Sequence, residues 1–177
     1  MKKELGFVGL GRMGLNMVTH LAAEGYRVVG YNRSEGPRAE AEKAGVETVN
    51  SLAEMVATLS APRVVWLMVS SKAVDAVLAE LTPLLETADT IVDGGNSFYQ
   101  DSLRRHRELK EKELNFLDCG TSGGMFGARH GASLMVGGAP EVYAAVEHIF
   151  ATLAVSDGYA RVGNEGARHF EDDPQRH

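Results

Sequence analysis

Three glycines stand at fixed spacing near the start of the chain, in Gly9-Leu10-Gly11-Arg12-Met13-Gly14. They follow a short apolar run, Leu5–Leu10, and precede Met13–Glu24, in which apolar residues recur with helical spacing. A G-x-G-x-x-G turn between a strand and a helix is typical of dinucleotide-binding folds. The first glycine permits a tight turn, the second lets a pyrophosphate reach the backbone, and the third lets helix and strand pack closely. The alternative is an ordinary glycine-rich turn.

The rest of the chain alternates between strand-like and helix-like segments. Continuous apolar strands separated by helices favour a parallel sheet that is covered on both faces. We therefore predict a Rossmann-type, doubly wound α/β fold with a mostly parallel sheet, formed by one domain over residues 1–162. The predicted strands are Leu5–Leu10, Arg27–Tyr31, Val46–Val49, Arg63–Val69, Thr90–Val92, Leu114–Leu117 and Ser133–Val136. The predicted helices are Met13–Glu24, Pro37–Lys43, Leu52–Leu59, Ala73–Leu85, Ser102–Lys112 and Glu141–Leu153.

The charge pattern argues against nucleic-acid and membrane partners. The chain of 177 residues has a net charge of −6 and lacks the basic face that nucleic-acid binders usually carry. Its one dense basic run, Arg104–Arg107, lies among glutamates and indicates a solvated helix face. No apolar stretch approaches the roughly 20 residues that span a bilayer.

The single cysteine, Cys119, excludes an intrachain disulfide, so we expect a reducing, cytoplasmic setting. It follows a strand and is more typical of a small buried residue than of a nucleophile. No group of His, Cys and acidic residues has the spacing of metal ligands, so we expect no metal site.

The end of the second predicted strand bears on the choice of cofactor. NAD-binding domains commonly place Asp or Glu there to hold the ribose 2′-hydroxyl. Here the strand ends at Tyr31 and continues Asn32-Arg33-Ser34. Arg33 can meet a 2′-phosphate and its two neighbours can donate hydrogen bonds to it, so we expect NADP rather than NAD. The alternative is that Arg33 is an ordinary surface arginine and that Glu35 reaches the ribose.

Three further motifs make the pattern more specific. They are Asp93-Gly94-Gly95-Asn96-Ser97, Gly120-Thr121-Ser122-Gly123-Gly124 and the glycine-bounded segment Gly131–Gly138. Together with the first turn, they resemble the coenzyme-binding domain of 6-phosphogluconate dehydrogenases, in the form of the shorter bacterial branch. The resemblance covers Leu5–Phe170. The Asp-Gly-Gly-Asn-Ser element is the most discriminating, because the related β-hydroxyacid dehydrogenases usually lack it.

The resemblance implies a reaction and a set of site residues. The reaction is the NADP- or NAD-linked oxidative decarboxylation of 6-phosphogluconate to ribulose 5-phosphate, in the pentose phosphate pathway. The implied substrate-binding residues are Asn96, Ser122, Gly123 and Gly124, with Asn96 between nicotinamide and substrate. The cofactor-binding residues that we expect are Gly9, Leu10, Gly11, Arg12, Met13, Gly14, Asn32, Arg33, Ser34, Met68, Val69 and Asn96. Met68 and Val69 are nearly as well explained as buried strand core.

The resemblance breaks near the end of the chain. The family continues with a stretch similar to G-A-G-H-F-x-K-M-V-H-N-G-I-E-Y, whose Lys is the general base and whose Glu is the acid. Here Arg168 stands where the family has Gly, and Asp172 stands where it has Lys. We therefore expect no catalytic residue in this chain, and we expect residues 163–177 to be the divergent, truncated start of an interdomain helix region.

The helical domain that follows in the family is also expected to be absent, which would expose apolar surface on the last helix and permit self-association as a homo-oligomer. We expect the chain to be inactive alone. Two alternatives stay open: the coenzyme domain of a β-hydroxyacid dehydrogenase, and a non-catalytic dinucleotide-binding domain.

Overall fold

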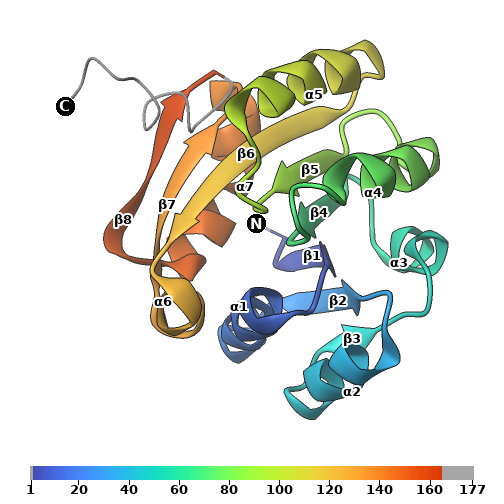
Figure 1. Cartoon of the computed structure of the whole chain (residues 1–177), viewed down its shortest axis with the longest axis vertical. Helices are drawn as coiled ribbons and strands as arrows, with labels where there is room; N and C mark the ends of the chain where they lie inside the picture. The colour runs from blue at the N-terminus through green and yellow to red at the C-terminus, as the bar shows by residue number, and fades with distance from the viewer. Residues whose placement is uncertain (1, 165–177) are drawn as a thin grey trace.

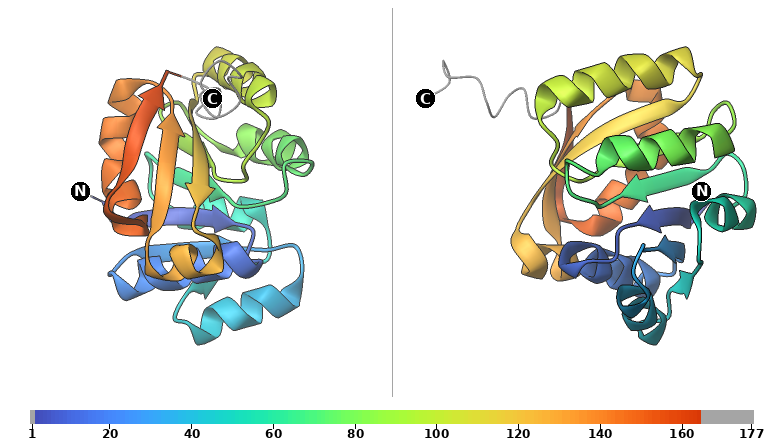
Figure 2. Two further views of the ribbon diagram at one scale, coloured as in Figure 1. Left: turned by 60° about the vertical axis from the view of Figure 1, so that its left-hand side comes forward. Right: turned by 45° about the vertical axis from the view of Figure 1, so that its right-hand side comes forward.

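A computed structural model describes residues 2–164, which form an eight-stranded sheet with helices on both faces (Figures 1 and 2). The strands are β1 (Glu4–Val8), β2 (Arg27–Tyr31), β3 (Glu47–Thr48), β4 (Val64–Leu67), β5 (Thr90–Asp93), β6 (Asn115–Ser122), β7 (Ala132–Gly137) and β8 (Ala154–Gly163). The helices are α1 (Arg12–Ala23), α2 (Glu35–Lys43), α3 (Leu52–Thr58), α4 (Val74–Leu81), the 3-10 helix η1 (Thr82–Leu84), α5 (Tyr99–Glu111), α6 (Gly124–His130) and α7 (Pro140–Leu153).

The strand order is β3-β2-β1-β4-β5-β6-β7-β8. All pairs from β3 to β6 are parallel, β7 is antiparallel to β6, and β8 is parallel to β7. The predicted doubly wound, mostly parallel sheet is therefore confirmed. The chain moves outward in one direction from β1 to β3 and in the other from β4, so the order reverses between β1 and β4. In such sheets the ligand crevice lies beyond the carboxyl ends of the strands at this reversal.

The side chains of alternate residues in the central strands point into two separate hydrophobic cores. Trp66 of β4 is fully buried in the core that α1 and α7 cover, and its ring stacks on Phe7 with 6.2 Å between centroids. Its neighbours Val65 and Leu67 point into the second core, under α3, α4 and α5. Burial on both faces explains why these strands read as continuous apolar runs.

Several element boundaries differ from the predicted ones for local reasons. The first strand ends at Val8 rather than Leu10, because Gly9 takes a φ of +100° and turns the chain. The fourth helix ends at Leu81 and gives way to η1, because Pro83 has no backbone N–H to continue the α-helical pattern. Two elements, α6 and β8, were not predicted, and β6 runs past its predicted end at Leu117 to Ser122.

The prediction of a solvated basic run on α5 is wrong for two of its residues. Arg105 is only 1% exposed, and the imidazole of His106 lies 2.7 Å from an Asp118 oxygen. These two side chains face the end of β5 and the middle of β6, where Asp93 and Asp118 are register partners. The helix is polar on its buried side because each of the two strands beneath it carries an acid there.

The predicted domain boundary between residues 162 and 163 stays a prediction. Arg168 and Asp172, on which the break in the family pattern rests, lie outside the described residues. Within the described part, no helix is long and apolar enough to cross a membrane.

Candidate functional site

The three glycines of the first turn differ in what a side chain would meet. An added Cβ at Gly9 would lie 2.3 Å from the carbonyl oxygen of Met68, and one at Gly14 would lie 2.0 Å from the carbonyl oxygen of Gly9. The fold itself therefore requires these two glycines. A Cβ at Gly11 would meet no atom within 4 Å. The absence of a side chain at Gly11 therefore leaves open space in front of the backbone, where a ligand can approach.

This open space faces the start of α1. Gly11 is the N-cap and supplies no side-chain cap, and the first turn holds no acidic residue. The first N–H groups of a helix have no partner within the helix, and its dipole favours negative charge at that end. Helix α1 therefore offers uncapped donors beside a backbone that nothing covers, which suits a phosphate. Arg12 and Met13, its first two residues, lie at this end.

Asn32 connects the glycine turn to the end of β2. Its side-chain oxygen accepts a hydrogen bond from the N–H of Leu10 at 3.0 Å, and its side-chain nitrogen donates to the carbonyl of Ser34 at 3.2 Å. The N–H of Gly9 also donates to the carbonyl of Tyr31 at 2.9 Å. Asn32 thus shapes the turn, a role that its position in the sequence does not reveal.

Arg33 and Ser34 lie exposed just beyond Asn32. The guanidinium of Arg33 makes no hydrogen bond or ion pair with any other described residue. Ser34 is the N-cap of α2 and its hydroxyl caps no backbone N–H. Glu35, the residue that the alternative interpretation would use, is the first residue of α2 and is exposed as well.

Met68 and Val69 follow β4 and lie between the first turn and the turn after β5. Both are half-buried, and the N–H of Met68 donates to the carbonyl of Val8 at 2.7 Å. They also explain one glycine of the Asp-Gly-Gly-Asn-Ser element. A Cβ at Gly95 would lie 2.5 Å from the carbonyl oxygen of Val69, while one at Gly94 would lie 2.5 Å from the indole nitrogen of Trp66. The two glycines let the end of β5 approach the end of β4.

The same element forms a closed turn around the carboxylate of Asp93. One carboxylate oxygen accepts a hydrogen bond from the N–H of Gly95 at 2.9 Å, and the other accepts one from the hydroxyl of Ser97 at 2.6 Å. Asn96, between them, is exposed and has a φ of +57°, a conformation that Asn tolerates better than most residues. Its side-chain oxygen accepts a hydrogen bond from the N–H of Thr121 at 3.1 Å. The structure thus joins two of the predicted motifs.

Ser122, Gly123 and Gly124 lie at the far end of β6 and are exposed. Gly123 and Gly124 have φ values of +121° and +59°, and a Cβ at Gly124 would meet nothing within 4 Å. The glycine-bounded segment Gly131–Gly138 has a different role. It forms β7, and a Cβ at Gly138 would lie 2.2 Å from the Leu117 side chain, so this glycine serves packing.

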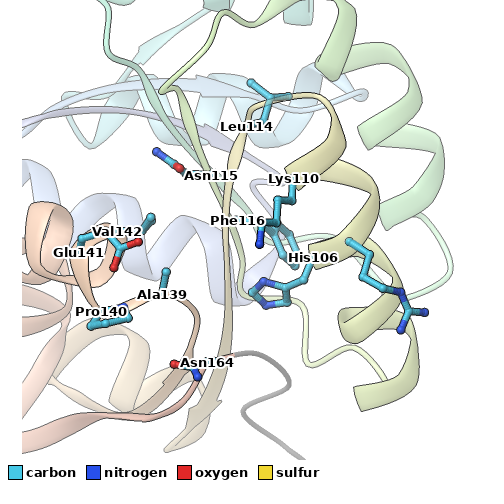
Figure 3. A pocket seen from close by; sticks show the side chains of 11 residues that line it. His106, Lys110, Leu114, Asn115, Phe116, Ala139, Pro140, Glu141, Val142 and Asn164 are labelled. Carbon is cyan, nitrogen blue, oxygen red and sulfur yellow. The ribbon is translucent and has the colours of Figure 1, made fainter.

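Outside the predicted site, the described chain also contains a buried thiol and a cavity. Cys119 is buried, and burial raises the pKa of its thiol far above the ordinary value, so it is not a ready nucleophile. Within residues 2–164, no group of three or more His, Cys, Asp or Glu side chains could hold a metal ion. A cavity of about 570 Å³ lies between α5 and the start of α7 (Figure 3). It is lined by residues that include His106, Lys110 and Glu141 and by none of the predicted site residues.

Comparisons with known proteins agree with this geometry. The family model of the NAD binding domain of 6-phosphogluconate dehydrogenase matches residues 4–163. The NAD(+)-dependent, decarboxylating 6-phosphogluconate dehydrogenase of Haloferax volcanii is 41% identical over 94% of this chain and 56% of its own length. A solved structure of the Plasmodium falciparum 6-phosphogluconate dehydrogenase, described as apo and in complex with NADP+ and with 6-phosphogluconate, matches with a TM-score of 0.88. The two sequences are 30% identical, and the match covers 94% of this chain and 38% of the Plasmodium chain.

The fold is shared more widely than this one enzyme. A structure of 3-hydroxyisobutyrate dehydrogenase from Mycobacterium tuberculosis with L-serine matches with a TM-score of 0.86 at 25% identity, over 94% of this chain and 56% of that one. The chain spans between 36% and 56% of the length of the curated relatives it matches. By the family match over nearly its whole length and by identities of about 40%, the chain belongs to the family of NAD-binding domains of 6-phosphogluconate dehydrogenase.

Proposed function

We propose that this chain binds NADP beyond the carboxyl ends of β1 and β4, as the coenzyme-binding part of a decarboxylating 6-phosphogluconate dehydrogenase. The observation that carries the proposal is the contrast among the three glycines. Gly9 and Gly14 are required by neighbouring backbone, whereas the space in front of Gly11 is open and lies beside the uncapped start of α1. A pyrophosphate placed there would accept hydrogen bonds from the first N–H groups of the helix.

The preference for NADP over NAD rests on Arg33. Its guanidinium is exposed, is not engaged by any described residue, and stands at the end of β2 where NAD-binding domains commonly have an acid. With Ser34 beside it, it would hold a 2′-phosphate by charge-assisted hydrogen bonds. Relatives carry both specificities by name, since the Plasmodium enzyme is described with NADP+ and the Haloferax enzyme as NAD(+)-dependent.

The substrate end of the proposed site lies where β5 and β6 finish. When bound, the nicotinamide would accept a hydride from the sugar acid. Asn96 has its side-chain oxygen engaged by Thr121, so it would offer its side-chain N–H groups to nicotinamide and substrate. Ser122 and the exposed backbone of Gly123 and Gly124 would hold the anionic end of 6-phosphogluconate. Met68 and Val69 would flank the cofactor.

Three further points belong to the proposal. The coenzyme domain of a β-hydroxyacid dehydrogenase shares the fold, but the Asp93–Ser97 element favours the 6-phosphogluconate enzyme. A cytoplasmic setting is proposed because the single cysteine is buried and unpaired. The large exposed apolar side chains in the described part are Phe98, Met125, Phe126 and Val155, none of them on α7, so self-association would use α6 and β8 rather than the last predicted helix.

Calorimetric titration of the chain with NADP+ and with NAD+ tests the cofactor proposal. We expect saturable binding of both, with NADP+ the tighter ligand. Binding of neither dinucleotide would refute the proposed function, and equal or tighter binding of NAD+ would refute the assigned preference while leaving dinucleotide binding in place. Titration with 6-phosphogluconate in the presence of NADP+, compared with 3-hydroxyisobutyrate, distinguishes the two substrate classes.

A further inference from the structure

The buried guanidinium of Arg105 needs an explanation that the proposed function does not supply. Helix α5 is strongly polar, and only Ser102, Arg105 and Leu109 of its residues are buried. Arg105 is among the largest fully buried side chains of the described chain, at 1% exposure. Charged side chains are rarely buried this far unless they are paired, because removing them from water is costly. Its partners therefore indicate what it does.

Arg105 links helix α4 to the end of β5. Its Nε donates a hydrogen bond to Asp75 Oδ1 at 2.9 Å, in the first turn of α4. Its Nη1 lies 3.6 Å from Asp93 Oδ2, and both side chains of this ion pair are 1% exposed. The two acids thus hold the guanidinium from opposite elements, and the hydrogen bond from Arg105 is the largest cause that lowers the pKa of Asp75.

Asp93 carries this constraint on to the turn that bears Asn96. The same carboxylate accepts hydrogen bonds from the N–H of Gly95 and from the hydroxyl of Ser97, on either side of Asn96. Both Asp93 and Ser97 are buried, whereas Asn96 is exposed at the crest of the turn. Arg105 itself reaches no exposed part of the site, so any effect on a ligand must pass through Asp93.

We propose that Arg105 is a positioning residue, whose buried guanidinium fixes the Asp93 carboxylate and so holds the Gly94–Ser97 turn that presents Asn96 to the nicotinamide half of the dinucleotide. The proposal rests on the proposed function for the identity of the ligand. It predicts an asymmetry. Loss of Arg105 should weaken contacts at the nicotinamide end, while the adenine half, held near β1 and β2, should bind as before.

The chain offers a matched control one residue away. Arg104 also binds Asp75, with Nη2 at 2.8 Å from Oδ2, but it is 37% exposed and has no contact with Asp93 among the described residues. Arg104→Met therefore removes an arginine and an Asp75 partner without touching the turn. Arg105→Met removes both links, and Arg105→Lys keeps the charge but loses the forked geometry of the guanidinium.

The test compares binding of NADPH with binding of 2′,5′-ADP, which carries only the adenine half. For Arg105→Met we expect NADPH to bind about tenfold more weakly, in the range of residues that act through a packed network. We expect 2′,5′-ADP to bind nearly as in the parent chain, Arg105→Lys to restore part of the loss, and Arg104→Met to change neither ligand. An equal loss for both ligands, or no loss for NADPH, would overturn the proposal.

A measurement without ligand keeps the two proposals separate. The N–H of Gly95 is held by Asp93, so its hydrogen exchange, followed by NMR, reports the turn directly. We expect faster exchange at Gly95 in Arg105→Met and not in Arg104→Met; unchanged exchange would refute the positioning role. If Arg105→Met fails to fold, Arg105→Lys serves for both measurements, because it keeps the charge and loses the forked geometry. If the parent chain binds neither ligand, the proposed function fails and the exchange result still decides the role of Arg105.

Discussion

The side-chain oxygen of Asn96 accepts a hydrogen bond from the backbone N–H of Thr121 at 3.1 Å. This bond joins the turn after β5 to the end of β6, one residue before Ser122. Because the oxygen is engaged, the amide nitrogen is the group that Asn96 can direct outward. Its backbone φ of +57° is set by the same turn. One hydrogen bond and one unusual backbone conformation thus set the orientation of the Asn96 side chain.

A substitution series separates these two contributions to stability. We expect Asn96→Ala to lower the free energy of unfolding by about 2 kcal/mol, because it loses the hydrogen bond and puts a Cβ without polar compensation at positive φ. Asn96→Gly should lose less, since glycine takes this conformation without strain. Asn96→Asp keeps an acceptor for Thr121 and should stay near the parent. Urea unfolding measures all three, and equal losses for Ala and Gly would mean that the positive φ is not adopted in solution.

Arg33 should decide the preference between the two dinucleotides. We expect Arg33→Ala to weaken NADP+ binding by about tenfold or more, the usual size of a hydrogen bond to a charged group, and to leave NAD+ binding nearly unchanged. Arg38 is the control, because its guanidinium already binds Asn50 Oδ1 at 2.7 Å. Calorimetry on Arg33→Ala and Arg38→Ala gives the comparison. If both variants lose the same NADP+ affinity, the loss comes from the lower positive charge of the chain and not from a contact of Arg33 with the 2′-phosphate.

The glycine turn predicts opposite outcomes at two of its positions. Gly11→Val should abolish dinucleotide binding and leave the fold intact, because no atom lies within 4 Å of the added Cβ and the new side chain fills the space for the pyrophosphate. Gly14→Ala should instead destabilise the fold, because its Cβ would lie 2.0 Å from the Gly9 carbonyl oxygen. Circular dichroism and thermal unfolding report the fold, and calorimetry reports binding. A Gly11→Val variant that binds normally would reduce Gly11 to a turn residue.

The sequence predicted well what depends on neighbours along the chain. The glycine turn and the continuous apolar strands follow from local spacing and from the two-sided burial of parallel strands. The capping of α3 is equally local, since Ser51 accepts a hydrogen bond from the N–H of Glu54, three residues further on, at 3.0 Å. Because neighbouring parallel strands end at the same edge of the sheet, the first turn, Met68 and Asn96 lie at one edge.

What the sequence could not predict depends on contacts between distant segments. Helix α6 contains Gly124 and Gly127, which are poor helix formers, and it is stabilised by packing against α1. Strand β8 is interrupted by Asp157 and Gly158, which disfavour a strand, and it forms because it pairs with β7. The burial of Arg105 is the clearest case. A run of basic residues indicates a solvated face unless one knows that Asp93 lies beneath it.

His148 should make the stability of the fold depend on pH. Burial above all, with a smaller effect of nearby positive charge that includes Lys3, holds the pKa of His148 below its ordinary value of 6.5. The unfolded chain therefore binds this proton more readily than the folded chain, so the stabilisation is complete above about pH 6.5 and is lost as the pH falls through the lower folded pKa. A protonated ring also offers no acceptor to the Tyr26 hydroxyl, which lies 2.7 Å from Nδ1. Urea unfolding at a series of pH values should show this decline, and His148→Gln should flatten it; an unchanged slope in the variant would assign the decline to other groups.

The chain as printed should not oxidise 6-phosphogluconate at an ordinary enzymatic rate. Removal of a hydride from a hydroxyl-bearing carbon requires that a positioned base take the hydroxyl proton. At the proposed substrate end, Asn96 and Ser122 can donate and accept hydrogen bonds, but neither is a base at neutral pH. The thiol of Cys119 is buried and its pKa is raised, so it supplies none either. By the family resemblance the base would be a Lys, and Asp172 stands at that position. Absorbance of NADPH at saturating 6-phosphogluconate, with a large excess of this chain, is the measurement. Turnover of about 1 per second or more, the range of ordinary enzymes, would show that a base has been overlooked among these residues.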